Sequence, residues 1–345
     1  MKRVRNFSFF VFLLLAAVGG VSLFSLSCGQ FELSAGTVLA SFSQYFGLPF
    51  LSGTVVTPEQ QAVLWHIRLP RTLVGLLTGA ALGASGAVLQ GIFSNPLADP
   101  GIIGVSSGAS VGAILAIALG FTSTSMLALP AAAFLGALLA VGLTVSLSWR
   151  HGRIPVMTLL LSGVVVGMFL AAVTAAILTA LNEQKMQQYL FWTIGGLDYR
   201  RWEHVFLGIG PISAGLILML ALSRQLNILV LGETEARAVG MPVGFYRFFL
   251  LAVASLTTAA GVCISGNIGF VGLVVPHMMR LLTGPDHQRL LPASMLAGAA
   301  FLVFCDAFGR ILLPTVEIRA GIMTAFIGTP YFLYLLRKSR SLHQD

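Results

Sequence analysis

The sequence predicts an all-α, polytopic membrane protein with about ten transmembrane helices, all within one domain over residues 1–345. Of the 345 residues, 57% are hydrophobic and 9% are charged, whereas a soluble domain carries about 25% charged residues. The mean hydropathy is +0.90. This length accommodates roughly ten apolar helices of about 20 residues with short connections, so it leaves no room for a sizeable soluble domain.

The first apolar segment, residues 7–27, follows Lys2, Arg3 and Arg5 and ends before Cys28. A basic start followed by an apolar run also occurs in secretory signal peptides. This run has about 20 residues, however, which is enough to span a bilayer and longer than a usual signal-peptide core. We therefore interpret it as the first transmembrane helix, entering from the cytoplasm.

Four further segments complete the first half of the chain. Residues 69–92 are rich in Gly and Ala, a composition typical of membrane helices whose backbones approach closely. A turn with the sequence N-P-L-A-D-P-G, residues 95–101, ends this segment, and a second apolar run over 101–120 follows at once. Residues 127–148 and 156–181 are long apolar runs of spanning length.

The second half repeats this arrangement. Residues 203–222 and 245–264 are continuous apolar runs, whereas residues 271–282 form a short one that contains Pro276. A short segment interrupted by proline predicts a broken membrane helix. Segments two to five and seven to ten are equal in number and opposite in orientation, so we also expect an inverted repeat. The last two segments lie near residues 292–312 and 319–336.

The basic residues give the orientation. With ten spans and a cytoplasmic start, both termini lie inside, and of the 20 Lys and Arg residues 13 fall inside and 7 outside. This excess agrees with the positive-inside rule, so the net charge of +8 does not indicate nucleic-acid binding. The inside set is Lys2, Arg3, Arg5, Arg150, Arg153, Arg224, Arg237, Arg247, Arg280, Arg289, Arg337, Lys338 and Arg340, and the outside set is Arg68, Arg71, Lys185, Arg200, Arg201, Arg310 and Arg319.

The sequence lacks the motifs of several function classes. The chain has no P-loop, no H-E-x-x-H and no G-x-S-x-G sequence, which argues against an enzyme. Its three cysteines do not have metal-ligand spacing. A transporter driven by an ion gradient needs membrane carboxylates or a cation site. Only Asp306 lies clearly inside a predicted span, and Arg310, one turn later, can neutralise it.

Two polar connections lie on the predicted cytoplasmic side. In residues 95–101 each proline disfavours helix at the preceding residue, which predicts a rigid turn. Residues 231–240, L-G-E-T-E-A-R-A-V-G, place Glu233 and Arg237 four apart, so the two side chains can pair on one helix face. By pattern alone, the first is compatible with an ordinary tight connection and the second with a solvated amphipathic connector.

Taken together with R-L-P-R-T-L-V-G at 68–75 and G-N-I-G-F-V-G-L-V-V-P-H at 266–277, these blocks resemble the FecCD/BtuC-type family. Its members are permease subunits of importers for iron-siderophores, haem and cobalamin. The resemblance covers about residues 60–337. It implies that His277 is a structural histidine with satisfied hydrogen bonds rather than a haem ligand or proton relay.

The resemblance implies a non-enzymatic permease subunit of an ATP-driven ABC importer in the bacterial inner membrane. The chain would form a homodimer, with the translocation path along the dimer axis. It would bind two ATPase subunits on the cytoplasmic side and a periplasmic substrate-binding protein on the other. ATP and Mg would bind to the ATPase, and no cofactor to this chain itself.

Three sets of site residues follow from the same resemblance. The arginines of the outer face would meet carboxylates of the binding protein; interfacial anchoring to lipid is the alternative. Arg200, Arg201 and Arg319 would extend this patch or contact substrate carboxylates. The sets are Arg68, Arg71 and Arg310 for docking; Gly232, Glu233, Ala236, Arg237 and Gly240, within residues 231–241, for coupling to the ATPase; and Asn95, Pro96, Leu97, Pro155, Val156 and Met157 for the cytoplasmic gate.

The substrate is an iron chelate in this interpretation. Residues 191–198, F-W-T-I-G-G-L-D, look more similar to haem permeases than to cobalamin permeases. Haem is therefore the favoured cargo and a ferric siderophore the next. A cobalamin importer of the same family is the alternative, and an ion-gradient-driven secondary transporter is the alternative from another class.

Overall fold

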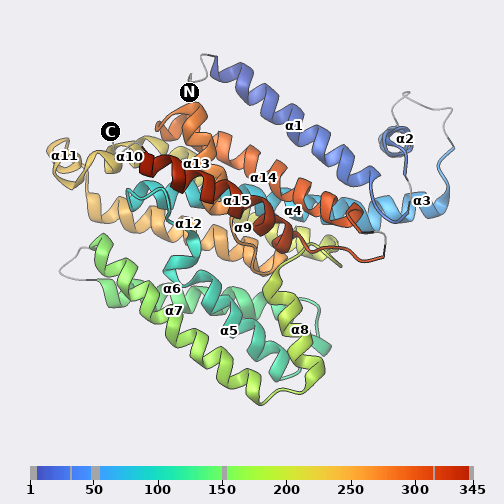
Figure 1. Ribbon diagram of the computed structural model, residues 1–345, viewed down its shortest axis with the longest axis horizontal. Coiled ribbons are helices and arrows are strands. Elements are labelled where there is room, and N and C mark those ends of the chain that lie inside the picture. Colours follow the sequence, from blue (N-terminus) through green and yellow to red (C-terminus); the bar gives the residue numbers. More distant parts are fainter. Residues whose placement is uncertain (1–5, 32, 48–54, 150–153, 314, 342–345) are drawn as a thin grey trace.

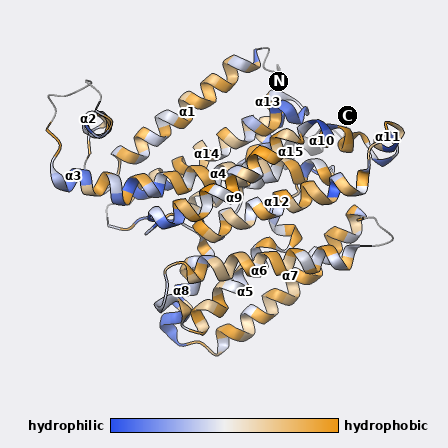
Figure 2. Ribbon diagram, turned by 180° about the vertical axis from the view of Figure 1, so that it is seen from behind, coloured by the Kyte–Doolittle hydropathy of each residue, from blue (hydrophilic) through white to orange (hydrophobic). Residues whose placement is uncertain are grey.

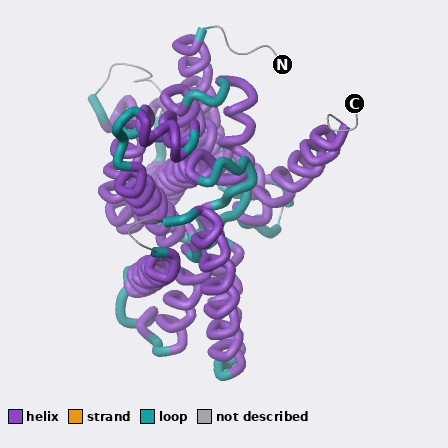
Figure 3. The backbone as a smooth tube through the Cα atoms, turned by 90° about the vertical axis from the view of Figure 1, so that its left-hand side faces the viewer, coloured by secondary structure: helices purple, strands orange, loops and turns teal. Residues whose placement is uncertain are grey.

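The protein is described by a computed structural model that covers residues 6–31, 33–47, 55–149, 154–313 and 315–341, with side chains described as far as residue 333. In these ranges every regular element is a helix, and loops join the helices (Figure 3). This confirms the predicted all-α fold. Lys2, Arg3, Arg5, Arg150 and Arg153 lie outside the described residues.

Ten apolar helices occupy the ranges in which the sequence predicts spans. Seven helical stretches are long and apolar enough to cross a membrane within the described ranges, and α5, α13 and Ala320–Leu333 are shorter apolar helices. The number of crossings and the inverted repeat stay predictions. The ten helices are α1 Phe7–Ser27, α4 Leu69–Ile92, α5 Val105–Ala118, α6 Ala128–Ser148, α7 Val156–Thr179, α9 Trp202–Ala221, α12 Val243–Ser265, α13 Val271–Thr283, α14 His287–Ile311 and α15 Ala320–Ser341.

Shorter helices fill the connections. A π-helical turn, Val63–Arg68, leads without a break from α3 into α4, so the second apolar helix begins earlier than predicted. The short elements are α2 Ala35–Tyr45, α3 Pro58–Ala62, α8 Glu183–Ile194, α10 Ser223–Leu231, α11 Glu233–Ala238 and the 3-10 turns η2 Pro100–Ile103 and η3 Phe121–Ser123.

Helix α4 is the centre of the larger of two helical layers. It packs against α9, α12, α13 and α14, and α1 packs along α14 (Figure 1). The second layer contains α5, α6 and α7, with α8 across its end (Figure 1). Most of α4 is buried, whereas α1 and α7 are largely exposed. Helices with exposed apolar faces are therefore the candidates for contact with lipid or with a second subunit.

Glycine allows α4 to approach its neighbours closely. A Cβ atom at Gly79 would overlap the carbonyl oxygen of Gly298 in α14, and one at Gly86 would overlap that of Gly272 in α13. No side chain other than hydrogen fits at such crossings. Small residues at close helix crossings are the usual basis of packing between membrane helices, as the composition of this segment predicts.

The two ends of the helical bundle are polar. One end holds α10, α11, the first turn of α1 and the last turn of α15, and the other holds α2, α3 and α8 (Figure 1). Figure 2 shows hydrophilic residues gathered at α11 and around α3 and α8, with hydrophobic helices between them. We call these the inner and the outer end, following the orientation that the basic residues predict.

Candidate functional site

The three outer arginines lie inside the fold. Arg68, Arg71 and Arg310 are 4%, 7% and 5% exposed. The sequence predicts a cationic patch that faces a partner protein, whereas the structure turns these side chains inward. Burying a guanidinium costs free energy unless it is paired or hydrogen-bonded. Arg71 and Arg310 have carboxylate partners, and Arg68 has backbone carbonyl partners.

Arg71 is the hub of a buried ion-pair cluster. Its guanidinium lies 2.8 Å from Asp306 Oδ1 of α14, 2.8 Å from Glu317 Oε2 and 3.2 Å from Asp198 Oδ1. Asp198 also lies 3.4 Å from Arg319 Nε. These groups come from α4, α14 and the loop segments 195–201 and 315–319. The cluster therefore fixes the two outer loops to the membrane helices.

Arg68 and Arg310 hold the end of α1 instead. Arg68 donates to the carbonyl oxygens of Leu26, Ser27 and Phe31, with 2.8 Å and 2.7 Å to the first two. Arg310 donates to the carbonyl oxygens of Ser25 and Cys28 at 2.9 Å and 3.1 Å. The carbonyls of Ser25, Leu26, Ser27 and Cys28 are at the C-terminal end of α1, where cations are favoured by the helix dipole.

The more accessible cations on this face are those expected only to extend the patch. Arg201 is exposed, while Arg200 and Arg319 are partly buried. Burial lowers the pKa of Arg200 to about 10, although the nearby Asp198 carboxylate acts in the opposite direction. With a pKa of about 10, Arg200 remains cationic at neutral pH, so the outer surface still offers positive charge. A docking role for Arg68, Arg71 and Arg310 stays a prediction.

The outer end is hollowed around these groups. One cavity of about 760 Å³ and another of about 530 Å³ share a wall. Aromatic and charged side chains alternate in that wall, and the Arg319 guanidinium lies 4.4 Å from the centre of the Phe191 ring. The shared residues are Phe191, Asp198, Tyr199, Arg200 and Arg319.

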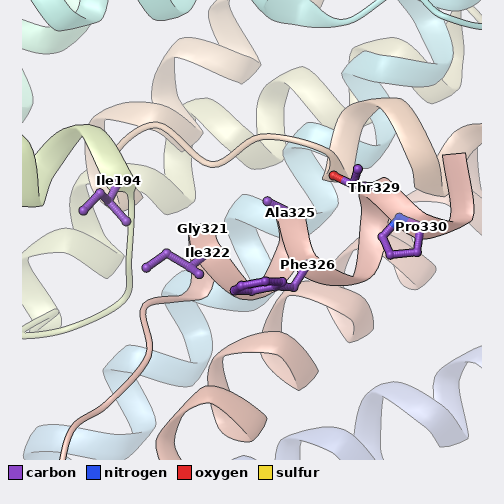
Figure 4. Close-up of a pocket in the computed structure, with 7 residues that line it drawn as sticks. All are labelled: Ile194, Gly321, Ile322, Ala325, Phe326, Thr329 and Pro330. Carbon is purple, nitrogen blue, oxygen red and sulfur yellow. The ribbon is translucent and has the colours of Figure 1, made fainter. Parts of the chain in front are cut away.

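A third hollow lies beside α15. It has a volume of about 600 Å³ and is almost wholly apolar. Ile322, Phe326 and Pro330 of α15 line one side, and Ile194 at the end of α8 lines another (Figure 4). Beside this hollow, the amide N–H of Gly321 in α15 donates a hydrogen bond of 3.2 Å to the carbonyl oxygen of Gly195, which follows α8. No pattern in the sequence distinguishes this surface, because its apolar residues resemble those of any lipid-facing helix.

The predicted gate residues are exposed at the inner end. Asn95 Oδ1 accepts from the Leu97 amide N–H at 2.9 Å, and Asp99 Oδ1 accepts from the Gly101 amide N–H at 2.7 Å. These bonds make the turn rigid, as its prolines predict. Burial raises the pKa of Asp99.

The gate turn is linked to α7. The turn runs into η2, which packs against α7 so closely that a Cβ atom at Gly163 would overlap the carbonyl oxygen of Ile102. Pro155 is the N-cap of α7, and Pro155 and Met157 are exposed while Val156 is half-buried. The two gate segments are thus connected through the packing of η2 on α7.

The predicted coupling segment forms the short helix α11, Glu233–Ala238. Gly232 and Gly240 flank it with φ of 127° and 78°, conformations that favour glycine. Glu233 and Arg237 pair at 2.6 Å, as their spacing predicts. Ala236 is fully buried, so it faces this chain and not a partner.

Two large exposed apolar residues flank α11: Leu231 ends α10, and Val239 is the C-cap of α11. Leu231 is 70% and Val239 is 69% exposed. Lipid would cover exposed apolar residues in the middle of the bundle. Leu231 and Val239 lie instead at the polar inner end. Exposed apolar side chains surrounded by polar residues are typical of protein interfaces. We therefore add them to the predicted coupling residues.

His277 differs from expectation. Its Nδ1 atom is buried and accepts or donates no hydrogen bond among the residues that the structure describes. The expectation of a fully satisfied structural histidine is therefore not met by the described part of the chain.

Comparisons with known proteins agree with the geometry. The model of the FecCD transport family matches residues 13–338. The chain is 46% identical over 300 residues to the cobalamin import system permease protein BtuC of Halobacterium salinarum, covering 84% of this chain and 80% of that protein. It is 40% identical over 288 residues to the vitamin B12 import system permease protein BtuC of Escherichia coli, covering 84% and 87%.

A solved structure is similar as well. It is described as an inward-facing conformation of a metal-chelate type ABC transporter. The TM-score is 0.84 and the sequence identity is 34%, and the match covers 95% of this chain and 99% of that one.

Proposed function

Because the chain belongs to the FecCD transport family of ABC importer permeases, we propose that it carries a corrinoid such as cobalamin across the cytoplasmic membrane. Permease subunits of this family are not enzymes, and ATP is bound and hydrolysed by a separate ATPase. One observation supports the cargo above others: relatives at 46% and 40% identity, each matched over 84% of this chain, are cobalamin permeases.

This replaces haem as the favoured cargo. The haem expectation depended on residues 191–198, and the structure gives these residues structural roles. Trp192 and Leu197 are buried, 6% and 1% exposed. Gly195 has a φ of 72°, and Asp198 joins the Arg71 cluster. Packing, turn geometry and ion pairing thus account for Trp192, Leu197, Gly195 and Asp198, the part of the segment that lies inside the fold.

The exposed apolar faces support a homodimer with the path along its axis. Of the apolar 18-residue stretch of α7, only 17% is buried within the chain. Met157, Leu161 and Met168 are 68%, 60% and 70% exposed. The apolar hollow on α15 offers a second such face (Figure 4). A large, poorly covered apolar surface favours burial against a second copy or lipid.

The two polar ends suit two different partners. At the inner end, the flanks of α11 present Leu231 and Val239 for insertion into a groove of the ATPase. At the outer end, Arg201 and the half-buried Arg200 and Arg319 offer positive charge to an acidic binding protein. Arg68, Arg71 and Arg310 would support that surface from below, by fixing the loops and the end of α1.

The rival hypothesis, transport driven by an ion gradient, is less well supported. Asp306, the carboxylate clearly inside a predicted span, lies 2.8 Å from Arg71 and 3.4 Å from Arg310. Two guanidinium groups pair with this carboxylate, so a transported cation would have to displace a buried ion pair.

A substrate panel tests the proposal. The permease would be purified with its ATPase and binding protein in lipid nanodiscs, and ATP hydrolysis measured with cobalamin, haem or a ferric siderophore. We expect cobalamin to bind the binding protein most tightly and to alter hydrolysis. A response to haem or siderophore alone would contradict the cargo and leave the family assignment intact.

A further inference from the structure

Arg247, near the start of α12, touches both the coupling segment and the gate. These two regions are about 80 residues apart in the sequence, with Ile154 and Glu233 at their edges. The Arg247 side chain is only 13% exposed. A guanidinium held between elements in this way transmits force better than a solvated one, because buried charged hydrogen bonds are strong and directional.

The first contact reaches the coupling helix. Arg247 Nη1 lies 3.3 Å from Glu233 Oε2. Glu233 begins α11 and holds Arg237 through its other oxygen at 2.6 Å. One carboxylate therefore joins the exposed face of α11 to α12, and a displacement of α11 pulls on Arg247.

The second contact reaches the gate. The same nitrogen, Arg247 Nη1, donates to the carbonyl oxygen of Ile154 at 3.3 Å. Ile154 is 2% exposed and directly precedes Pro155, the N-cap of α7. Proline fixes its own φ and restricts the residue before it. A shift of the Ile154 carbonyl is therefore passed to the first turn of α7.

A neighbouring contact holds the other side of this connection. Trp149, at the end of α6, and Phe248, next to Arg247, meet edge to face with ring centres 5.6 Å apart. The start of α12 thus grips the α6–α7 connection at Trp149 and at Ile154. A movement of α11 can therefore reach the start of α7 through the first turns of α12.

We propose that Arg247 is the positioning residue that couples the ATPase-binding helix α11 to the cytoplasmic gate at the start of α7. The inference rests on the proposed coupling role of α11 and gate role of Pro155, Val156 and Met157. It adds the physical link between them.

The experiment compares four variants in proteoliposomes that contain permease, ATPase and binding protein. Arg247→Met removes both contacts, and Arg247→Lys keeps a donor. The exchange Glu233→Arg with Arg247→Glu keeps the ion pair, but a carboxylate cannot donate to the Ile154 carbonyl. Arg224→Met, an exposed arginine of α10, is the matched control.

Two quantities are measured: cobalamin transported per ATP hydrolysed, and the distance between spin labels at Met157→Cys of the two subunits with and without nucleotide. For Arg247→Met we expect assembly and basal hydrolysis to persist while transport per ATP falls about tenfold, equivalent to about 1.4 kcal/mol. The nucleotide-dependent change in label distance should be lost.

The other variants decide the interpretation. Arg247→Lys should recover most of the coupling, the exchange should stay uncoupled, and Arg224→Met should match the wild type. Wild-type coupling in Arg247→Met, or in the exchange if Arg247→Met fails to assemble, would overturn the inference. If the wild-type complex itself shows no ATP-driven uptake, the proposed function fails instead.

Discussion

At the scale of single residues, charge pairing inside the membrane-embedded fold decides what the outer arginines do. Asp306 is 2% exposed and has two guanidinium partners. Asp306→Ala should therefore leave Arg310 without its carboxylate partner and Arg71 with only the more exposed Asp198 and Glu317. Removing one partner of a buried ion pair costs about 3–5 kcal/mol, so thermal unfolding of the purified permease should move to clearly lower temperature.

Glu203→Gln is the control for that prediction, since Glu203 is an exposed carboxylate in the first turn of α9. Exposed charges contribute about 0–1 kcal/mol, so its unfolding temperature should change little. Equal effects of the two substitutions would show that the Arg71 cluster is not a stabilising element.

Exposure also selects the arginine that best tests docking. Arg201 is exposed at the outer end, so Arg201→Glu can change the surface without disturbing the buried cluster. Affinity for the binding protein should fall about fivefold at low salt, and the loss should shrink as salt rises because screening acts over about 10 Å at 0.1 M.

Arg224→Glu places the same charge change at the inner end and should leave binding-protein affinity unaltered. If Arg201→Glu binds as the wild type does at low salt, the docking surface lies elsewhere.

The sequence identifies Arg68 and Arg71 as candidate functional residues, but it does not predict that their side chains point into the fold. Arg68 and Arg71 share a helix face and are recognisable as a motif. Their burial depends on partners distant in the chain, however: Asp306 is 235 residues from Arg71, and Leu26 is 42 residues from Arg68. No local pattern contains that information.

At the scale of helices, glycine contacts set the packing of α4. Gly86→Ala places a methyl group against the Gly272 carbonyl and should destabilise the fold by about 1–3 kcal/mol through overpacking. The matched control is Gly142→Ala in α6, where the new methyl group meets nothing within 4 Å.

Alanine is favoured over glycine in an open helix by about 1 kcal/mol, so Gly142→Ala should be neutral or stabilising. Unfolding temperatures of the two variants in the same detergent provide the comparison. Similar temperatures would contradict the close crossing of α4 and α13.

The exposed residue Val239, at the C-terminal end of α11, provides a test of ATPase binding. Val239→Asp puts a charge into the surface proposed to insert into the ATPase. Loss of one buried valine contact weakens binding by roughly tenfold or more, measured as ATPase retained on the immobilised permease. Gln187→Asp, an exposed change in α8 at the outer end, should retain the ATPase fully. Full retention by Val239→Asp would remove this surface from the interface.

Helices are predicted correctly from the sequence where they form long, continuous apolar segments. The predicted range 127–148 differs by one residue from α6, Ala128–Ser148. Prediction fails for α2 and α8, which are short and mixed in character. Asn182 caps α8 by accepting from the Lys185 amide N–H at 3.0 Å, and an Asn followed by Glu183 is a start signal that could have revealed this helix.

At the scale of the whole molecule, the dimer axis should bring the two gates together. Cysteines at Leu97 or Met157, which are 44% and 68% exposed, should crosslink between subunits in one nucleotide state and not in another. Phe206→Cys, exposed on α9, should not crosslink. Crosslinks that form regardless of nucleotide, or never form, would argue against a gate at these residues.

The most direct measurement is cobalamin uptake into proteoliposomes containing this permease, its ATPase and its binding protein. The account predicts uptake that requires all three proteins and ATP, and that continues when ionophores dissipate the proton and sodium gradients. Uptake that needs a gradient, or proceeds without the ATPase, would contradict it.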